Sequence, residues 1–149
     1  MNATDTIFAL ALASNLNPQH NFQYAHQRIC ELGSVEFSNI YIIPCRDGVG
    51  EDYWNAACLL RSSLQPEHIV ECLKQWEAAS GRVRPSHQIS LDVDLIAWGE
   101  SLQQMQFNPK KMPLALDVKI PMSDLWSHPL FIHPEQHFPI VQCQEVIKI

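Results

Sequence analysis

The hydrophobic pattern of the first hundred residues alternates between the periods of strands and helices. Residues 6–12 form a nearly continuous apolar run, which predicts a buried strand that leaves the sheet near Ser14. Asn17 and Pro18 suit the start of a helix, and apolar residues then recur every three or four positions before Gly33. This spacing predicts an amphipathic helix whose apolar face comprises Phe22, Ala25, Ile29 and Leu32.

Three further strands and a second helix are predicted before residue 100. Residues 35–43 and 53–60 are rich in β-branched and aromatic residues and predict strands, separated by a polar, glycine-bearing loop at 44–52. Residues 64–79 place their apolar side chains on one helical face. Residues 89–98 alternate between polar and apolar positions, which predicts the fourth strand.

This order, βαββαβ, is that of a ferredoxin-like α+β core with both helices crossing one face of the sheet. Residues 101–149 contain six of the ten prolines and have weak periodicity, so we expect an irregular C-terminal extension. Within it we predict a short helix near residues 122–126 and a final strand at 140–147. A chain of 149 residues and 17.0 kDa suits one substantial core, so we predict a single domain, residues 1–149.

Charge and cysteine content narrow the class of protein. Sixteen acidic against ten basic residues give a formal net charge of −6, which argues against a nucleic-acid-binding surface. The N-terminus has no basic residue before Arg28, and no apolar run reaches the length of roughly 18 residues that a membrane span needs. The five scattered cysteines form no CxxC pair. We therefore expect a cytoplasmic protein with reduced thiols; its oligomeric state is not predicted.

Asp92 and Asp94 are the first candidates for chemistry. Alternation along the fourth predicted strand places both carboxylates on one face, where their repulsion and desolvation are costly without a cation. Mg²⁺ prefers a few carboxylates completed by water and nucleotide phosphates, so the pair suits a Mg²⁺-ATP anchor. The same Asp-x-Asp pattern also fits a strand face that is open to water.

Two other groups of residues have polar patterns with more than one interpretation. Glu77, Arg82 and Arg84 follow one another around Gly81 at the end of the second helix, where the arginines suit either polyphosphate or the helix C-terminus. Tyr53 and Asn55 share one strand face, which suits either a flat heterocycle or a packed aromatic beside a satisfied amide.

Taken in order, these segments resemble the 6-hydroxymethyl-7,8-dihydropterin pyrophosphokinase family. That family has Gly-Ser-Asn after its first strand, then a P-x-x-Y-x-N-A-A-type segment, E-x-x-x-G-R-x-R and L-D-[aliphatic]-D. Here the corresponding segments are residues 13–15, 44–57, 77–84 and 91–94, with a weaker P-E-x-x-F-P match at 134–139.

The resemblance implies transfer of the terminal pyrophosphoryl group of ATP to the hydroxymethyl group of a dihydropterin, a step of folate biosynthesis. It implies that Asp92 and Asp94 hold two Mg²⁺ ions with ATP. Arg82 and Arg84 would contact the phosphates from a mobile loop as catalytic and nucleotide-binding residues, with Glu77 near the nucleotide. The pterin-binding residues implied by the resemblance are Pro44, Cys45, Tyr53 and Asn55.

Several family residues are absent from this chain. Ala13 replaces the glycine of Gly-Ser-Asn, the loop from Arg84 to Asp92 is about three residues shorter than in the family, and Ile89 replaces an arginine. The family's C-terminal histidine, arginine and second pterin-stacking ring fall on Pro113–Leu116, Pro121–Met122 and Ser123–Asp124. An alternative is therefore a non-catalytic relative that binds a pterin, a nucleotide or a protein. If the enzyme is active, compensating charge could come from Lys110, Lys111 or Lys119.

Overall fold

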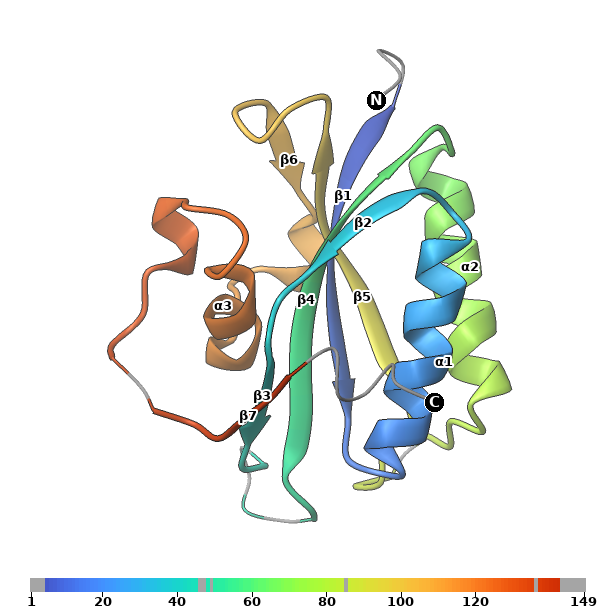
Figure 1. The fold of residues 1–149 in the computed structure, drawn as a ribbon, viewed down its shortest axis with the longest axis vertical. Coiled ribbons are helices and arrows are strands. Elements are labelled where there is room, and N and C mark those ends of the chain that lie inside the picture. Colours follow the sequence, from blue (N-terminus) through green and yellow to red (C-terminus); the bar gives the residue numbers. More distant parts are fainter. Residues whose placement is uncertain (1–4, 46–47, 49, 85, 136, 143–149) are drawn as a thin grey trace.

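A computed structural model of the chain describes residues 5–45, 48, 50–84, 86–135 and 137–142. Its seven strands form one sheet in the order β6-β5-β1-β4-β3-β7, and β2 pairs with β4 beside this path (Figure 1). The pairings are antiparallel. The elements are β1 (Thr6–Ser14), α1 (Pro18–Cys30), β2 (Ser34–Phe37), β3 (Ile40–Ile43), β4 (Tyr53–Ser62), α2 (Pro66–Ala79), β5 (Asp92–Gly99), β6 (Met105–Phe107), the 3-10 turn η1 (Pro109–Lys111), α3 (Leu116–Met122), the 3-10 turn η2 (Pro129–Phe131) and β7 (Ile140–Val141).

Both long helices begin and end where local chemistry permits. Each has a proline in its first turn, Pro18 in α1 and Pro66 in α2, where the missing N–H costs no helical hydrogen bond. The chain leaves α2 through Gly81 at φ +86°, a left-handed conformation that glycine adopts without a Cβ clash. None of the helices in the described ranges is long and apolar enough to cross a membrane.

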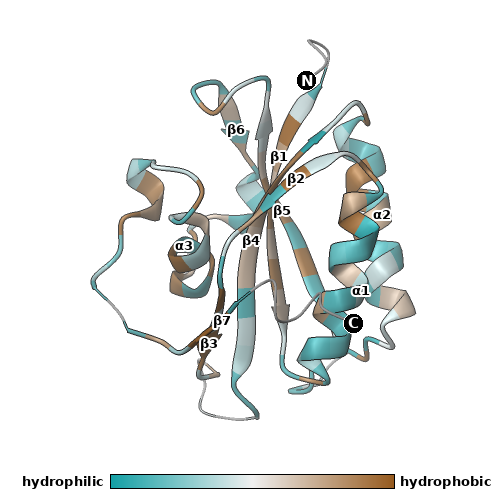
Figure 2. Cartoon of the chain, in the orientation of Figure 1, coloured by the Kyte–Doolittle hydropathy of each residue, from teal (hydrophilic) through white to brown (hydrophobic). Residues whose placement is uncertain are grey.

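The two faces of the sheet bury separate hydrophobic clusters. Alternate residues of β1 such as Phe8 and Leu10 pack with α1 and α2, whereas Ile7 and Ala9 point to the opposite face, where α3 lies (Figure 1). Figure 2 shows hydrophilic colours along much of α1 and hydrophobic colours on the central strands. Residues of β1, β4, β5 and α3 together line a cavity on this face.

The α+β prediction is confirmed, but several boundaries were wrong. The strand expected at 35–43 is two strands, because the Ser38 hydroxyl accepts the Ala57 N–H at 2.8 Å and interrupts the ladder. The last predicted strand of the core begins at Asp92 rather than Ile89. The helix expected at 122–126 is α3, at 116–122; burial of Met122 and Trp126 against the sheet, not helical periodicity, explains their apolar character.

The C-terminal extension is only partly irregular. Strand β6 and the turns η1 and η2 were not predicted, because each comprises three residues and has little periodicity of its own. The strand expected at 140–147 is described at Ile140–Val141, where it pairs with β3. Its remaining residues from 143 onward lie outside the described part of the chain.

Candidate functional site

The register of the three central strands brings the candidate residues onto one face. Ala13 of β1 pairs with Asn55 of β4 on one side and with Asp92 of β5 on the other. Two residues earlier, Ala11 pairs with Asp94. Directly opposed residues of antiparallel strands point to the same side of the sheet, so the amide and both carboxylates lie over a floor of small alanine side chains. The predicted shared face of Asp92 and Asp94 is therefore confirmed.

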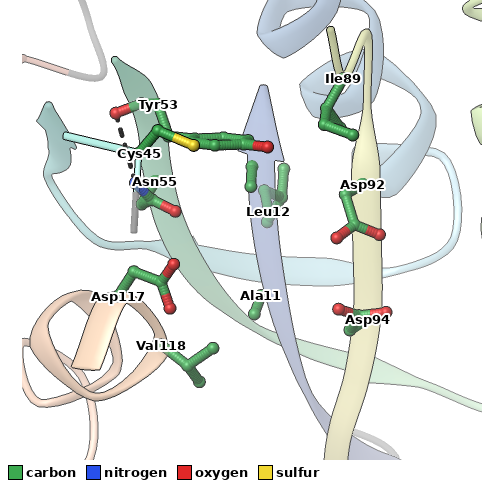
Figure 3. Close-up of a pocket in the computed structure, with 11 residues that line it drawn as sticks. Ala11, Leu12, Cys45, Tyr53, Asn55, Ile89, Asp92, Asp94, Asp117 and Val118 are labelled. Carbon is green, nitrogen blue, oxygen red and sulfur yellow. Dashed lines mark hydrogen bonds between the residues drawn. The ribbon is translucent and has the colours of Figure 1, made fainter. Parts of the chain in front are cut away.

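A cavity of about 330 Å³ lies over this floor. Tyr53, Asn55 and Cys45 line one side of it, and Asp92 and Asp94 line the other (Figure 3). Asn55 is 3% exposed, and its Nδ2 donates a hydrogen bond to the Tyr53 carbonyl at 3.3 Å. The cavity thus combines an aromatic ring, an amide and carboxylates, which suits a flat polar heterocycle.

Asp92 and Asp94 also line a second, larger groove of about 700 Å³. Its other charged residues come from along α2, from the segment after it and from the turn η1. They are Glu67, Lys74, Glu77, Arg82, Arg84, Lys110 and Lys111. The two aspartates therefore lie at the boundary between a cavity with an aromatic and an amide side chain and a groove rich in cations.

Glu77 completes an acidic cluster with the two aspartates. One carboxylate oxygen from each of Glu77, Asp92 and Asp94 lies within 4.8 Å of the others. The Glu77 side chain reaches β5, where its Oε2 accepts the Val93 N–H at 2.9 Å. Three hard oxygen donors this close suit Mg²⁺. The sequence motif had placed Glu77 near a nucleotide but gave no sign that it joins the aspartates.

Burial and mutual repulsion perturb these carboxyl groups. Burial first, and then the neighbouring Asp92 and Asp94, raise the pKa of Glu77 from 4.5 to about 7, against the opposing Val93 hydrogen bond. Burial and Asp92 also raise the pKa of Asp94, although Lys111 and Arg82 lower it. The cluster therefore favours binding a proton or a cation.

Two cations from the groove contact the aspartates. Arg82, whose side chain is 10% exposed, places Nη1 3.6 Å from Asp92 Oδ1 and donates to the Leu91 carbonyl at 3.2 Å. Lys111 Nζ donates to Asp94 Oδ1 at 2.8 Å. Burial alone would lower the pKa of Lys111, but the carboxylates, Asp94 foremost, raise it, so the lysine carries its charge.

Arg84 lies farther out than Arg82. Its side chain is 64% exposed, and Nη2 is 3.4 Å from Glu77 Oε1. The two arginines therefore occupy different environments despite their shared motif. Arg82 is largely buried beside the start of β5, whereas Arg84 is exposed and contacts Glu77.

Ser14 and Asn15, at the end of β1, hold the loop that leads into β5 by hydrogen bonds. The Asn15 Nδ2 donates to the His87 carbonyl at 2.8 Å, its Oδ1 accepts the Ile89 N–H, and its backbone N–H donates to the Ile89 carbonyl at 2.9 Å. Ser14 is fully buried beside it and donates to the Leu16 carbonyl at 3.1 Å. These bonds explain why the strand starts after Ile89.

Of the remaining predicted residues, some line the smaller cavity and others do not. Cys45 lines the smaller cavity, but Pro44 is exposed and is not among the residues that line it. Residues 46, 47 and 49 of the glycine-bearing loop lie outside the described residues. Sequence reasoning missed Asp117, which points into the cavity from α3, and did not single out Lys111 from the other lysines (Figure 3). Neither residue belongs to a motif, so only the fold could locate them.

A comparison with protein-family models gives a match over residues 9–138 to the family described as 7,8-dihydro-6-hydroxymethylpterin-pyrophosphokinase (HPPK). The match begins within β1 and ends just before β7, so it includes both cavities and the acidic cluster. Because it covers most of the 149 residues, the chain belongs to the HPPK family.

Proposed function

We propose that this protein transfers pyrophosphate from ATP to 6-hydroxymethyl-7,8-dihydropterin in a Mg²⁺-dependent reaction. Membership of the HPPK family suggests pyrophosphoryl transfer in folate biosynthesis, and enzymes of this family use ATP with Mg²⁺. The observation that carries the proposal is the position of Asp92 and Asp94, which line both the smaller cavity and the cationic groove. A transfer between two ligands needs its charge-stabilising groups between them.

The smaller cavity is assigned to the pterin. The Tyr53 ring offers a stacking surface, and the buried Asn55 amide offers both a donor and an acceptor to the ring edge. The larger groove is assigned to ATP, because the guanidinium groups of Arg82 and Arg84 match phosphate oxygens. In this arrangement the pterin hydroxymethyl oxygen attacks the β-phosphorus and gives up its proton to water. The bond from that phosphorus to the oxygen bridging to the α-phosphate breaks, and AMP leaves.

Glu77, Asp92 and Asp94 are the residues that would hold Mg²⁺. Their clustered oxygens fit the ion's preference for hard donors, and the raised pKa values of Glu77 and Asp94 reflect carboxyl groups that lack enough positive charge. When bound, the ion supplies charge neutralisation and alignment of the phosphates. Arg82 keeps its contact with the Asp92 carboxylate and so helps to position the pair.

A non-catalytic HPPK-like role is favoured by one specific observation. Ile89 stands where the resemblance implies an arginine, so this chain lacks that charge close to the aspartates that the two cavities share. Each missing charged hydrogen bond is worth roughly 1.5–3 kcal/mol, so several together weaken ATP binding by orders of magnitude. On this alternative the domain binds a pterin, a nucleotide or a protein partner without turnover.

The test is AMP release from ATP in the presence of 6-hydroxymethyl-7,8-dihydropterin, with and without Mg²⁺. We expect release that needs both the pterin and the ion, at a lower rate than in a family member with the complete arginine and histidine set. Asp94→Ala should abolish it and weaken metal-dependent nucleotide binding, whereas Asp5→Ala, a change in a residue that lines neither cavity, should not. Pterin binding without any AMP release would favour the non-catalytic role, and unchanged nucleotide binding in Asp94→Ala would refute the metal assignment.

A further inference from the structure

Lys111 lies in the larger groove, where it contacts Asp94, although no motif in the sequence connects the two residues. Its ammonium group is 2.8 Å from Asp94 Oδ1, and the two side chains are 37% and 29% exposed. Asp94 is one of the carboxylates assigned to the metal ion. The lysine therefore holds a cation where the proposed function requires another cation to bind.

Hydrogen bonds hold the turn that carries Lys111 against β5, so the backbone position of the lysine is determined by the fold. Asn108 caps η1: its backbone N–H donates to the Ile96 carbonyl at 2.8 Å, and its Nδ2 donates to the Leu95 carbonyl at 2.9 Å. The Lys111 backbone N–H donates in turn to the Asn108 carbonyl at 3.0 Å. These bonds place the base of the lysine side chain beside the aspartate strand, whatever its ammonium group contacts.

We propose that Lys111 is a phosphate-binding residue that pairs with Asp94 in the free protein and moves to the nucleotide when the metal–nucleotide complex binds; this rests on the function proposed above. A divalent ion at Asp94 repels the ammonium group and competes for the same oxygen. The long, flexible lysine side chain can then turn from that carboxylate toward the nearest anion in the groove, which is the phosphate chain.

The charge distribution of the groove supports this exchange. Glu77, Asp92 and Asp94 form the acidic cluster, and Arg82 offsets part of its charge by a contact from Nη1 to Asp92. The Lys111 side chain lines the same groove and is already 37% exposed, so its ammonium group can reorient without leaving a fully buried position. It thus supplies positive charge in a chain that lacks the family's C-terminal histidine and arginine.

The exchange predicts opposite effects of one substitution on two affinities. In Lys111→Met, Mn²⁺ alone, followed by electron paramagnetic resonance, should bind about two- to fivefold more tightly because its competitor is gone. The Mg²⁺ complex of α,β-methylene-ATP, followed by calorimetry, should bind about tenfold more weakly because a charged phosphate contact is lost. Lys111→Arg should keep the nucleotide affinity near that of the unaltered chain, and Lys111→Gln provides a second neutral variant.

Lys119→Met is the control, because it makes the same change in a lysine of α3 that lines neither cavity. It should change both affinities less than about twofold, because its charge lies outside the groove. If Lys111→Met binds both Mn²⁺ and the nucleotide complex more tightly, the lysine only competes with the metal ion, and the proposal is wrong. It is also wrong if both affinities fall or if neither changes. If the unaltered chain binds no metal–nucleotide complex, the proposed function fails too; a bound complex with unchanged affinity in Lys111→Met refutes the role of the lysine alone.

Discussion

Glu77→Gln should make the metal-free protein more stable at neutral pH. Glu77 lies within 4.8 Å of two other carboxylates, and its side chain is 13% exposed. Burial and the neighbouring aspartates raise its pKa from 4.5 to about 7 in the folded protein. Glutamine removes the charge while keeping an oxygen that can accept the Val93 N–H, which now bonds to Glu77 at 2.9 Å.

The sign follows from proton linkage. Below pH 4.5, Glu77 is protonated in both the folded and the unfolded chain. The folded protein is then more stable than at high pH, where it must hold a charged Glu77 beside two aspartates. Between pH 4.5 and about 7 the folded protein holds the proton and the unfolded chain does not. The free energy of unfolding therefore falls as pH rises through this window.

The magnitude follows from the same two values. A change from 4.5 to about 7, at about 1.4 kcal/mol per pKa unit, sets an upper limit of about 3 kcal/mol. Asp94 also has a raised pKa and can take up part of the proton, so we expect Glu77→Gln to gain about 1–3 kcal/mol above pH 7. Loss of the Arg84 contact subtracts little, because Arg84 is 64% exposed.

Urea denaturation at a series of pH values, with a chelator present, measures this effect. The unaltered protein should lose stability from pH 4.5 to about 7, and Glu77→Gln should lose much less. Glu36→Gln, a change of the same type on β2, is the control and should follow the unaltered protein. A glutamine variant that is less stable than the unaltered protein at pH 8, or that keeps its full pH dependence, would refute the electrostatic reasoning.

Of three further predictions, two concern the site and one concerns the contact between Tyr41 and Asp124. Asn55→Ala should weaken binding of a pterin about tenfold by calorimetry, because it removes a buried amide, and unaltered binding would place the pocket elsewhere. Arg82→Ala should abolish AMP release and lower the free energy of unfolding by about 1–3 kcal/mol. Arg84→Ala should leave the stability in urea unchanged, because Arg84 is exposed. Equal losses of stability in the two variants would contradict their different burial. Burial and the Asp124 carboxylate raise the pKa of Tyr41 to about 12, so ultraviolet titration should show one of the three tyrosines ionising near that pH. Asp124→Asn should lower that pKa, and an unchanged titration would argue against the contact.

The sequence alone determined the elements whose pattern is local and long. The first strand, both long helices and the β4 strand were predicted near their observed positions, because a run of seven or more residues shows its period clearly. The Asp-x-Asp alternation also placed Asp92 and Asp94 on one face without knowledge of the neighbouring strands. The prediction of one domain spanning residues 1–149 stays a prediction.

The tertiary structure decided which of these residues meet. Strand pairing around Ala13 brought Asn55 and Asp92 onto the same face of the sheet, although they are distant in sequence. Packing of α2 against β5 added Glu77 to the aspartates, and the Asn108 bonds to β5 brought Lys111 to Asp94. Such contacts depend on register and packing between segments, and neither leaves a periodic signal in the residues concerned. The sequence therefore determined the strand face on which the aspartates lie, while the assembly of the sheet determined the charges that surround it.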